Sequence, residues 1–183
     1  VDRRLLKWEV IPSVEKVFSI FEPHTEWISK GKQNKKVELG HKLLIATDQH
    51  HFIVHHQVIE GKADAALTIP LADTLLSKYK NIESLSLDKG FYSKENKELL
   101  SLAIPCLVMP KKGKLNKQEK GEESEKKFKK LRNLHSAVES NINQLEHNGL
   151  ERFPDKGIKN YKRYVSLGIL SYNLNRLGKL LFE

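Results

Sequence analysis

The order of predicted elements along the chain indicates an α/β domain with a mixed sheet. Segments rich in β-branched and other apolar residues, which predict strands, dominate residues 17–59. From residue 67 onward, segments with apolar residues at helical spacing alternate with short apolar segments typical of strands. The 183 residues, 39% of them hydrophobic, are enough for one domain with its own core.

The first third of the chain contributes most of the predicted strands. Residues 17–21 (VFSIF) form a short apolar strand, and the polar segment 22–36 that follows ends in a cluster of lysines. Residues 37–47 and 52–59 predict two further strands. The four residues between them, Asp48-Gln49-His50-His51, favour a hairpin turn.

The remainder alternates helices with short strands. The apolar spacing predicts a helix over 67–79, a strand over 85–87, a helix over 93–102 that Ser93 caps, a strand over 104–109, and a last helix over 161–182. The segment 111–130 is dense in lysine and glutamate, which indicates either a solvated helix or a mobile insertion. A long helix with an apolar stripe from Phe128 to Leu145 follows, and Asn148-Gly149 ends it.

The net charge and the cysteine content limit which classes of partner and which cellular compartment fit this sequence. The net charge of +9 favours a polyanionic partner, nucleic acid or an anionic membrane surface, although from charge alone a basic protein without such a partner is an equally good interpretation. The single cysteine, Cys106, argues against a disulfide or zinc framework and for a reducing compartment, so we expect a cytoplasmic protein. No apolar run approaches the ~20 residues of a membrane helix, so no membrane partner is expected.

Two carboxylates are candidates for chemistry. Asp88 follows a predicted strand and precedes a glycine turn, and this edge of an open α/β sheet is where ligands bind. Glu139 comes directly after Val138 of the apolar helical stripe, at the rim of the buried face, with His135 one turn earlier. Taken singly, each has a simpler interpretation: an aspartate that opens a turn, and an exposed helical glutamate.

Taken together, these segments resemble the DDE transposases of bacterial insertion sequences. Leu87-Asp88-Lys89-Gly90-Phe91 is similar to the A-D-K-G-Y strand end that carries the second aspartate of that family, and Glu139, at a separation of 139 − 88 = 51 residues, stands where its glutamate lies on a later helix. Further segments resemble family motifs in the same order. Residues 40–48 are similar to its G-Y-K-x-H strand, residues 61–64 to its G-N-x-H-D turn, and residues 109–112 to its I-P-x-R-K segment. Residues 18–27 and 135–140 most resemble the ISNCY-type group.

The resemblance implies an RNase H-like mixed sheet flanked by helices, with three carboxylates that bind Mg²⁺ or, in its place, Mn²⁺. It implies cleavage and rejoining of DNA, with Asp88 and Glu139 each binding a metal ion. The partners would be the ends of the insertion sequence and the target DNA, with self-association on DNA in the nucleoid. Basic residues near the site would contact phosphates: Lys89, Lys111, Lys112, Lys114, Arg132 and His135.

The sequence departs from the family pattern at the first aspartate. In the family this residue lies on the first central strand, before the segment that here begins near Val17, and nothing upstream of Val17 is typical of that strand. We therefore expect residues 1–183 to be the C-terminal part of a catalytic domain that lacks its first strand and is inactive alone. Asp48 is a poor substitute because it lies in the hairpin turn, and Asp64 and Asp73 are interpreted as helix-capping or surface residues.

A second departure concerns basic contacts. Related groups often carry an arginine four residues before the glutamate and a lysine seven after it, where this chain has His135 and Glu146. An alternative function is therefore a non-catalytic, nucleic-acid-binding remnant of a transposase. A third is a metal-independent scaffold, in which Asp88 and Glu139 would not converge. The pairs His50-His51 and His55-His56 are interpreted as hairpin and sheet-surface residues, because neighbours on a strand face opposite sides.

Overall fold

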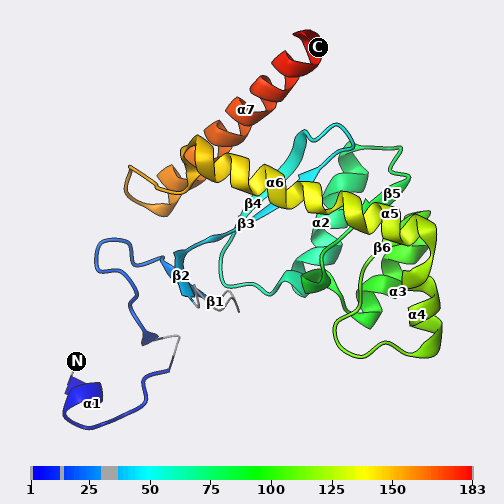
Figure 1. The fold of residues 1–183 in the computed structure, drawn as a ribbon. Coiled ribbons are helices and arrows are strands. Elements are labelled where there is room, and N and C mark those ends of the chain that lie inside the picture. The colour runs from blue at the N-terminus through cyan, green and yellow to red at the C-terminus, as the bar shows by residue number, and fades with distance from the viewer. Residues whose placement is uncertain (1, 13–14, 30–36, 183) are drawn as a thin grey trace.

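The computed structural model describes residues 2–12, 15–29 and 37–182, which form helices and short strands (Figure 1). In chain order the elements are α1 (Asp2–Leu5), β1 (Glu26–Ser29), β2 (Val37–Gly40), β3 (Lys42–Thr47), β4 (Ile53–Ile59), α2 (Asp64–Lys78), β5 (Ser84–Ser86), the 3-10 turn η2 (Lys89–Phe91), α3 (Lys94–Ala103), β6 (Cys106–Val108), α4 (Lys117–Ser124), α5 (Lys126–Leu134), α6 (Ser136–Leu145), the π-helical turn η3 (Glu146–Leu150) and α7 (Ile158–Phe182). The predicted α/β class is confirmed.

The strands of the described residues form three separate pairs in place of one mixed sheet. The pairs β1–β2 and β3–β4 are antiparallel, and β5–β6 is parallel. The predicted strand over residues 37–47 is divided at Gly40, whose φ of 148° is a backbone conformation that favours glycine. The chain therefore bends at this point, so that β2 pairs back with β1 while β3 continues into the hairpin with β4.

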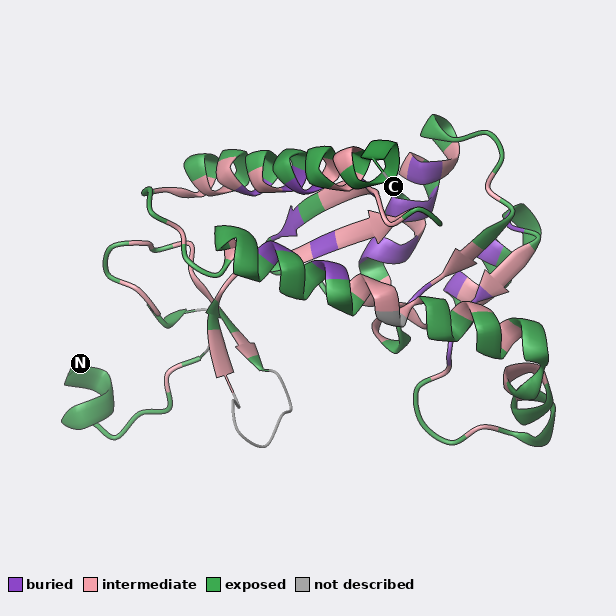
Figure 2. Ribbon diagram, turned by 45° about the horizontal axis from the view of Figure 1, so that its top comes forward, coloured by how far each residue is buried: buried purple, intermediate pink, exposed green. Residues whose placement is uncertain are grey.

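The β3–β4 hairpin lies at the centre of the molecule, between helices on its two faces (Figure 2). Neighbouring residues on a strand face opposite sides. Leu44 therefore belongs to the core that contains α2, whereas Leu43 and Ile45 pack against the core formed by α7 and the end of α6. The first core also contains buried residues of α2, of α3 and its C-terminal cap, and of the segments after β5 and β6, namely Leu67, Leu71, Leu75, Leu87, Leu100, Ile104 and Met109. The helix α2 thus joins the hairpin to the β5–β6 pair.

Local rules account for the turns and helix ends. The Asp48 carboxylate accepts hydrogen bonds from the backbone N–H groups of His50 and Phe52, both at 2.9 Å, as expected for an aspartate that opens a hairpin turn. Ser93 caps α3 by accepting from Asn96 N at 3.0 Å, as predicted. The structure forms helices α4 and α5 over most of the lysine- and glutamate-rich segment, and a reciprocal capping box at Asn116 begins α4.

The predicted strand over residues 17–21 is wrong. These residues adopt no regular structure, and Val17, Ile20 and Phe21 are largely exposed, at 72%, 86% and 81%. An apolar run becomes a strand only when another strand satisfies its backbone hydrogen bonds, and no described residue pairs with this segment. The strand forms instead at Glu26–Ser29, within the stretch interpreted as polar. The lysine cluster at 30–36 lies outside the described residues.

Candidate functional site

The first part of the site is the edge of the β5–β6 pair. The backbone N–H of buried Leu87 donates to Val108 O at 2.8 Å, which extends the parallel pairing by one residue beyond β5. Asp88 comes next, at the point where the chain leaves the sheet, and is exposed. Its Oδ1 accepts from Lys89 N at 2.6 Å, so Asp88 is the N-cap of η2. The predicted position of Asp88 at a strand end before a glycine turn is therefore the observed one.

The η2 turn behind Asp88 is held by hydrogen bonds from two helices. The carbonyl oxygen of Phe91 accepts from Thr68 Oγ1 at 3.0 Å and from Asn96 Nδ2 at 3.2 Å. Thr68 and Asn96 are both buried, and Asn96 Nδ2 also donates to Ala65 O on α2. Such bonds restrict the turn, so the carboxylate of Asp88 is presented on a fixed backbone.

Gly90 allows Asp64 to approach this turn closely. A Cβ atom at Gly90 would lie 2.9 Å from Asp64 Oδ2, well inside van der Waals contact. Asp64 also accepts from Lys42 Nζ at 3.2 Å. Of the two interpretations of Asp64, helix cap or surface residue, the structure supports the second: the side chain is 34% exposed, the N-cap of α2 is Ala63, and no side chain caps this helix. The physical reason is that its carboxylate faces Lys42 and the η2 turn, away from the free N–H groups of its own helix.

The second part of the site comes from the two helices that run almost end to end in Figure 1, α5 and α6. Arg132, His135 and Glu139 recur at intervals of three and four residues, which places them on one side of the helical path. All three line a pocket of about 180 Å³ whose other wall is formed by the β5 strand end, Asp88, Lys89 and Pro110. This cavity is named the Asp88–Glu139 pocket. The two carboxylates, 51 residues apart in the sequence, thus lie on a single pocket.

The basic residues predicted to contact DNA have different surroundings. Lys89, Arg132 and His135 line the Asp88–Glu139 pocket, and Arg132 Nη1 lies 3.8 Å from Glu123 Oε2. Lys111 forms an ion pair with Glu119 at 2.7 Å, and this pairing raises the pKa of Lys111 and lowers that of Glu119. Lys112 is exposed and donates to Gly90 O at 3.5 Å, and Lys114 is also exposed.

The pocket suits a divalent cation in its chemistry, although its ligand set is small. Mg²⁺ prefers oxygen ligands and is commonly held by one or two carboxylates together with water and substrate phosphates. Asp88 and Glu139 supply two such groups, and the cations beside them could balance a phosphate. Within the part of the chain that the structure describes, no cluster of three or more His, Cys, Asp or Glu side chains could hold a metal ion.

The other aspartates lie outside this pocket. Asp48 is held in the β3–β4 turn through the hydrogen bonds described above, and Asp73 is exposed on α2. Neither lines the Asp88–Glu139 pocket.

A histidine pair that sequence reasoning did not identify lies between the loop before β1 and the start of β3. His24 Nδ1 and His41 Nε2 are 2.7 Å apart, and His24 Nε2 is 2.7 Å from Glu22 Oε2. The side chain of His41 is 3% exposed, and its Nδ1 lies 3.7 Å from Glu26 Oε1. Residues at positions 22, 24 and 41 have no shared sequence spacing, so only the fold brings them together. Glu22 also accepts from Gly157 N at 3.0 Å, so this cluster connects the loop before β1 to the residue ahead of α7.

Stability is expected to fall as the pH is lowered. Burial lowers the pKa of His41 below the usual 6.5, against an opposing effect of Glu26, and burial likewise lowers the pKa of His55 and His56. Because the unfolded chain then binds more protons than the folded one, this stability is fully present above about pH 6.5 and is lost as the pH falls from there through the lower pKa values of the folded state. Thermal melts from pH 8 to pH 5.5 measure it, and His41→Gln should flatten the profile. The matched substitution at exposed His147, His147→Gln, should leave the pH profile of stability unchanged. If the two variants have the same profile, burial of His41 is not the cause of the pH dependence.

Comparison with protein families identifies the family of this chain. A family model described as the transposase DDE domain matches residues 14–174. No curated protein and no solved structure matches the chain. No helix among the described residues is long and apolar enough to cross a membrane. The family match includes both Asp88 and Glu139 and spans most of the 183 residues. The chain therefore belongs to the family of transposases with a DDE domain.

Proposed function

We propose that this chain supplies two metal-binding carboxylates, Asp88 and Glu139, to the active site of an insertion-sequence transposase that cleaves DNA and transfers strands. Family membership indicates a transposase function, and with it an enzyme of the nuclease and transferase type that acts on DNA and uses divalent metal ions. The observation that carries the residue assignment is that both carboxylates line one pocket together with Lys89, Arg132 and His135.

The chemistry of this pocket follows from its charges. Cleavage of a phosphodiester adds negative charge to a phosphorus that is already surrounded by anionic oxygens, and bound Mg²⁺ would stabilise that charge and activate the attacking oxygen. Asp88 and Glu139 would hold the ions, from the fixed η2 turn and from α6 respectively. Lys89 and Arg132 would bind the phosphates on either side of the scissile bond, where they would position the strand without reading its sequence.

We further propose that the third carboxylate comes from a strand preceding the described residues in an RNase H-like sheet. The support is that β3–β4 and β5–β6 are separate two-stranded sheets joined by the core of α2. A strand placed between β3 and β5 would unite them into one mixed sheet. If it ran parallel to β5, its C-terminal end would lie beside Asp88, since the ends of parallel neighbours meet at one edge.

The test is a nicking assay on supercoiled plasmid with Mg²⁺ or Mn²⁺. Residues 1–183 alone should not nick, because the ligand shared between two ions would be absent. A chain extended in frame by the genomic segment that encodes an upstream aspartate-bearing strand should nick. An extended chain that binds DNA but never nicks would instead favour the non-catalytic remnant.

Binding of duplex DNA by residues 1–183 is expected to be weak, independent of sequence, and strongly dependent on salt. With about five phosphates neutralised by Lys and Arg, the logarithm of the association constant should fall with the logarithm of salt concentration at a slope of roughly −4 to −5. Fluorescence anisotropy on two unrelated duplexes from 50 to 200 mM NaCl measures it. An affinity that does not change over this range would remove the electrostatic basis for DNA binding.

A further inference from the structure

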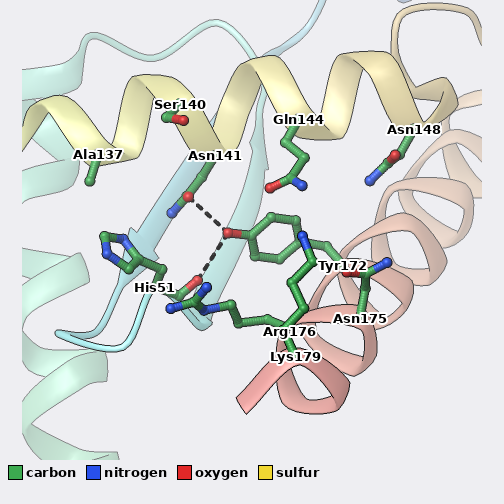
Figure 3. Close-up of a pocket in the computed structure, with 10 residues that line it drawn as sticks. All are labelled: His51, Ala137, Ser140, Asn141, Gln144, Asn148, Tyr172, Asn175, Arg176 and Lys179. Atoms are coloured by element: carbon green, nitrogen blue, oxygen red, sulfur yellow. Dashed lines mark hydrogen bonds between the residues drawn. The ribbon is translucent and has the colours of Figure 1, made fainter. Parts of the chain in front are cut away.

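A second cavity, of about 210 Å³, lies between α6, α7 and the β3–β4 turn (Figure 3). Its α6 wall consists of Ala137, Ser140, Asn141 and Gln144, whose spacing is that of one helical face. Glu139 belongs to another face of the same helix. This cavity is named the α6–α7 pocket, and it is distinct from the Asp88–Glu139 pocket.

The α6–α7 pocket is lined by cations and by neutral polar groups. Arg176 and Lys179 come from successive turns of α7, and no aspartate or glutamate is among the lining residues. Arg176 Nε donates to His50 O at 3.0 Å, which anchors the side chain at the hairpin turn, and its guanidinium extends toward His51 in Figure 3. A lining with positive charge and no carboxylate favours an anionic ligand.

Asn141 adds a buried donor without an acceptor. The residue is 5% exposed, and its Oδ1 accepts from Tyr172 OH at 2.8 Å. Its Nδ2 has no hydrogen-bond partner among the described residues, and the amide lies at the pocket, opposite Tyr172 (Figure 3). Tyr172 OH also lies 3.1 Å from His51 O, so its single proton is shared between two acceptors. Because a buried N–H group without an acceptor is unfavourable, Asn141 Nδ2 would be stabilised by an acceptor that a ligand brings to this wall of the pocket.

We infer that the α6–α7 pocket binds a phosphate group of the DNA backbone, with Arg176 and Lys179 balancing its charge and Asn141 Nδ2 donating to a phosphate oxygen. The inference rests on the proposed function in taking DNA as the ligand. Ser140 of the pocket wall directly follows Glu139 along α6, so a strand held here would be anchored close to the carboxylates and outside the reacting centre. It would therefore position DNA without taking part in the chemistry.

The test measures the affinity of a 20-base-pair duplex, without divalent metal, as a function of salt. Lys179→Gln should lower the salt slope by about one and weaken binding equally for unrelated sequences. Asn141→Asp keeps the acceptor for Tyr172 and replaces the free donor by an oxygen that repels phosphate, so it should weaken binding about tenfold. The matched controls lie in the exposed turn after α2, Lys80→Gln and Asn81→Asp, and should retain near-normal affinity.

A second readout is the side-chain amide NMR signal of Asn141. It should shift on addition of the duplex and, at higher concentration, of inorganic phosphate. Circular dichroism checks that the Asn141→Asp variant folds. If it does not fold, Lys179→Gln still tests the inference, because Lys179 is exposed and its substitution should leave the fold intact. Unchanged slopes in Lys179→Gln, or a signal that responds to inorganic phosphate but not to DNA, would overturn the inference. If the extended chain binds DNA through this pocket but never nicks, the proposed function alone is overturned, whereas a native chain that binds no DNA would overturn both.

Discussion

Asp88→Asn and Glu139→Gln are each expected to abolish metal-dependent nicking by the extended transposase. Each substitution keeps the shape of the side chain and removes the negative charge, so the fold should persist while the affinity for Mg²⁺ falls. Loss of a correctly held ion removes several kcal/mol of transition-state stabilisation, which corresponds to a rate reduction of roughly a thousandfold or more. Single-turnover nicking rates at saturating DNA measure it.

Asp73→Asn on α2 and Glu151→Gln after η3 are matched controls, because both side chains are exposed and neither lines the Asp88–Glu139 pocket. These variants should nick at near-normal rates. A different result would change the site assignment. If residues 1–183 nick DNA robustly, and if Asp48→Ala removes this activity while Asp64→Ala does not, then Asp48 is the first carboxylate and the three-carboxylate site lies within these residues.

Leu145→Ala is expected to cause the largest loss of stability. Leu145 ends α6, is 2% exposed, and packs with Ile53, Val58 and residues of α7 in the second core. Removing three heavy atoms from such a site leaves a cavity and costs about 2–5 kcal/mol of unfolding free energy. Equilibrium denaturation in urea measures the change.

The matched control is Leu167→Ala on α7, which is 63% exposed and should change the unfolding free energy by less than about 0.5 kcal/mol. Since Leu145 also holds the helix that carries Glu139 and Asn141, Leu145→Ala should weaken DNA binding beyond what the unfolded fraction explains. Equal losses of stability in the two variants would show that α6 is not held through this contact.

Local sequence determined much of the secondary structure. The hairpin turn at Asp48, the cap at Ser93, the strand end at Asp88 and the helical periodicity of α2 follow from interactions within a few residues, so they could be predicted without the fold. The same holds for the two candidate carboxylates, whose neighbours carry the resemblance to transposases. The roles of Asp88 and Glu139 remain predictions until the variants are measured.

Tertiary structure decided the features that depend on a distant partner. The apolar run 17–21 pairs with no described strand and is irregular, whereas Glu26–Ser29, within the segment interpreted as polar, forms a strand because Val37–Gly40 supplies its hydrogen bonds. The carboxylate of Asp64 lies against Gly90 and does not cap its own helix, and the buried amide of Asn141 packs against Tyr172, 31 residues away. No local pattern contains such contacts, because backbone pairing and side-chain burial are satisfied by whichever segments the folded chain brings together.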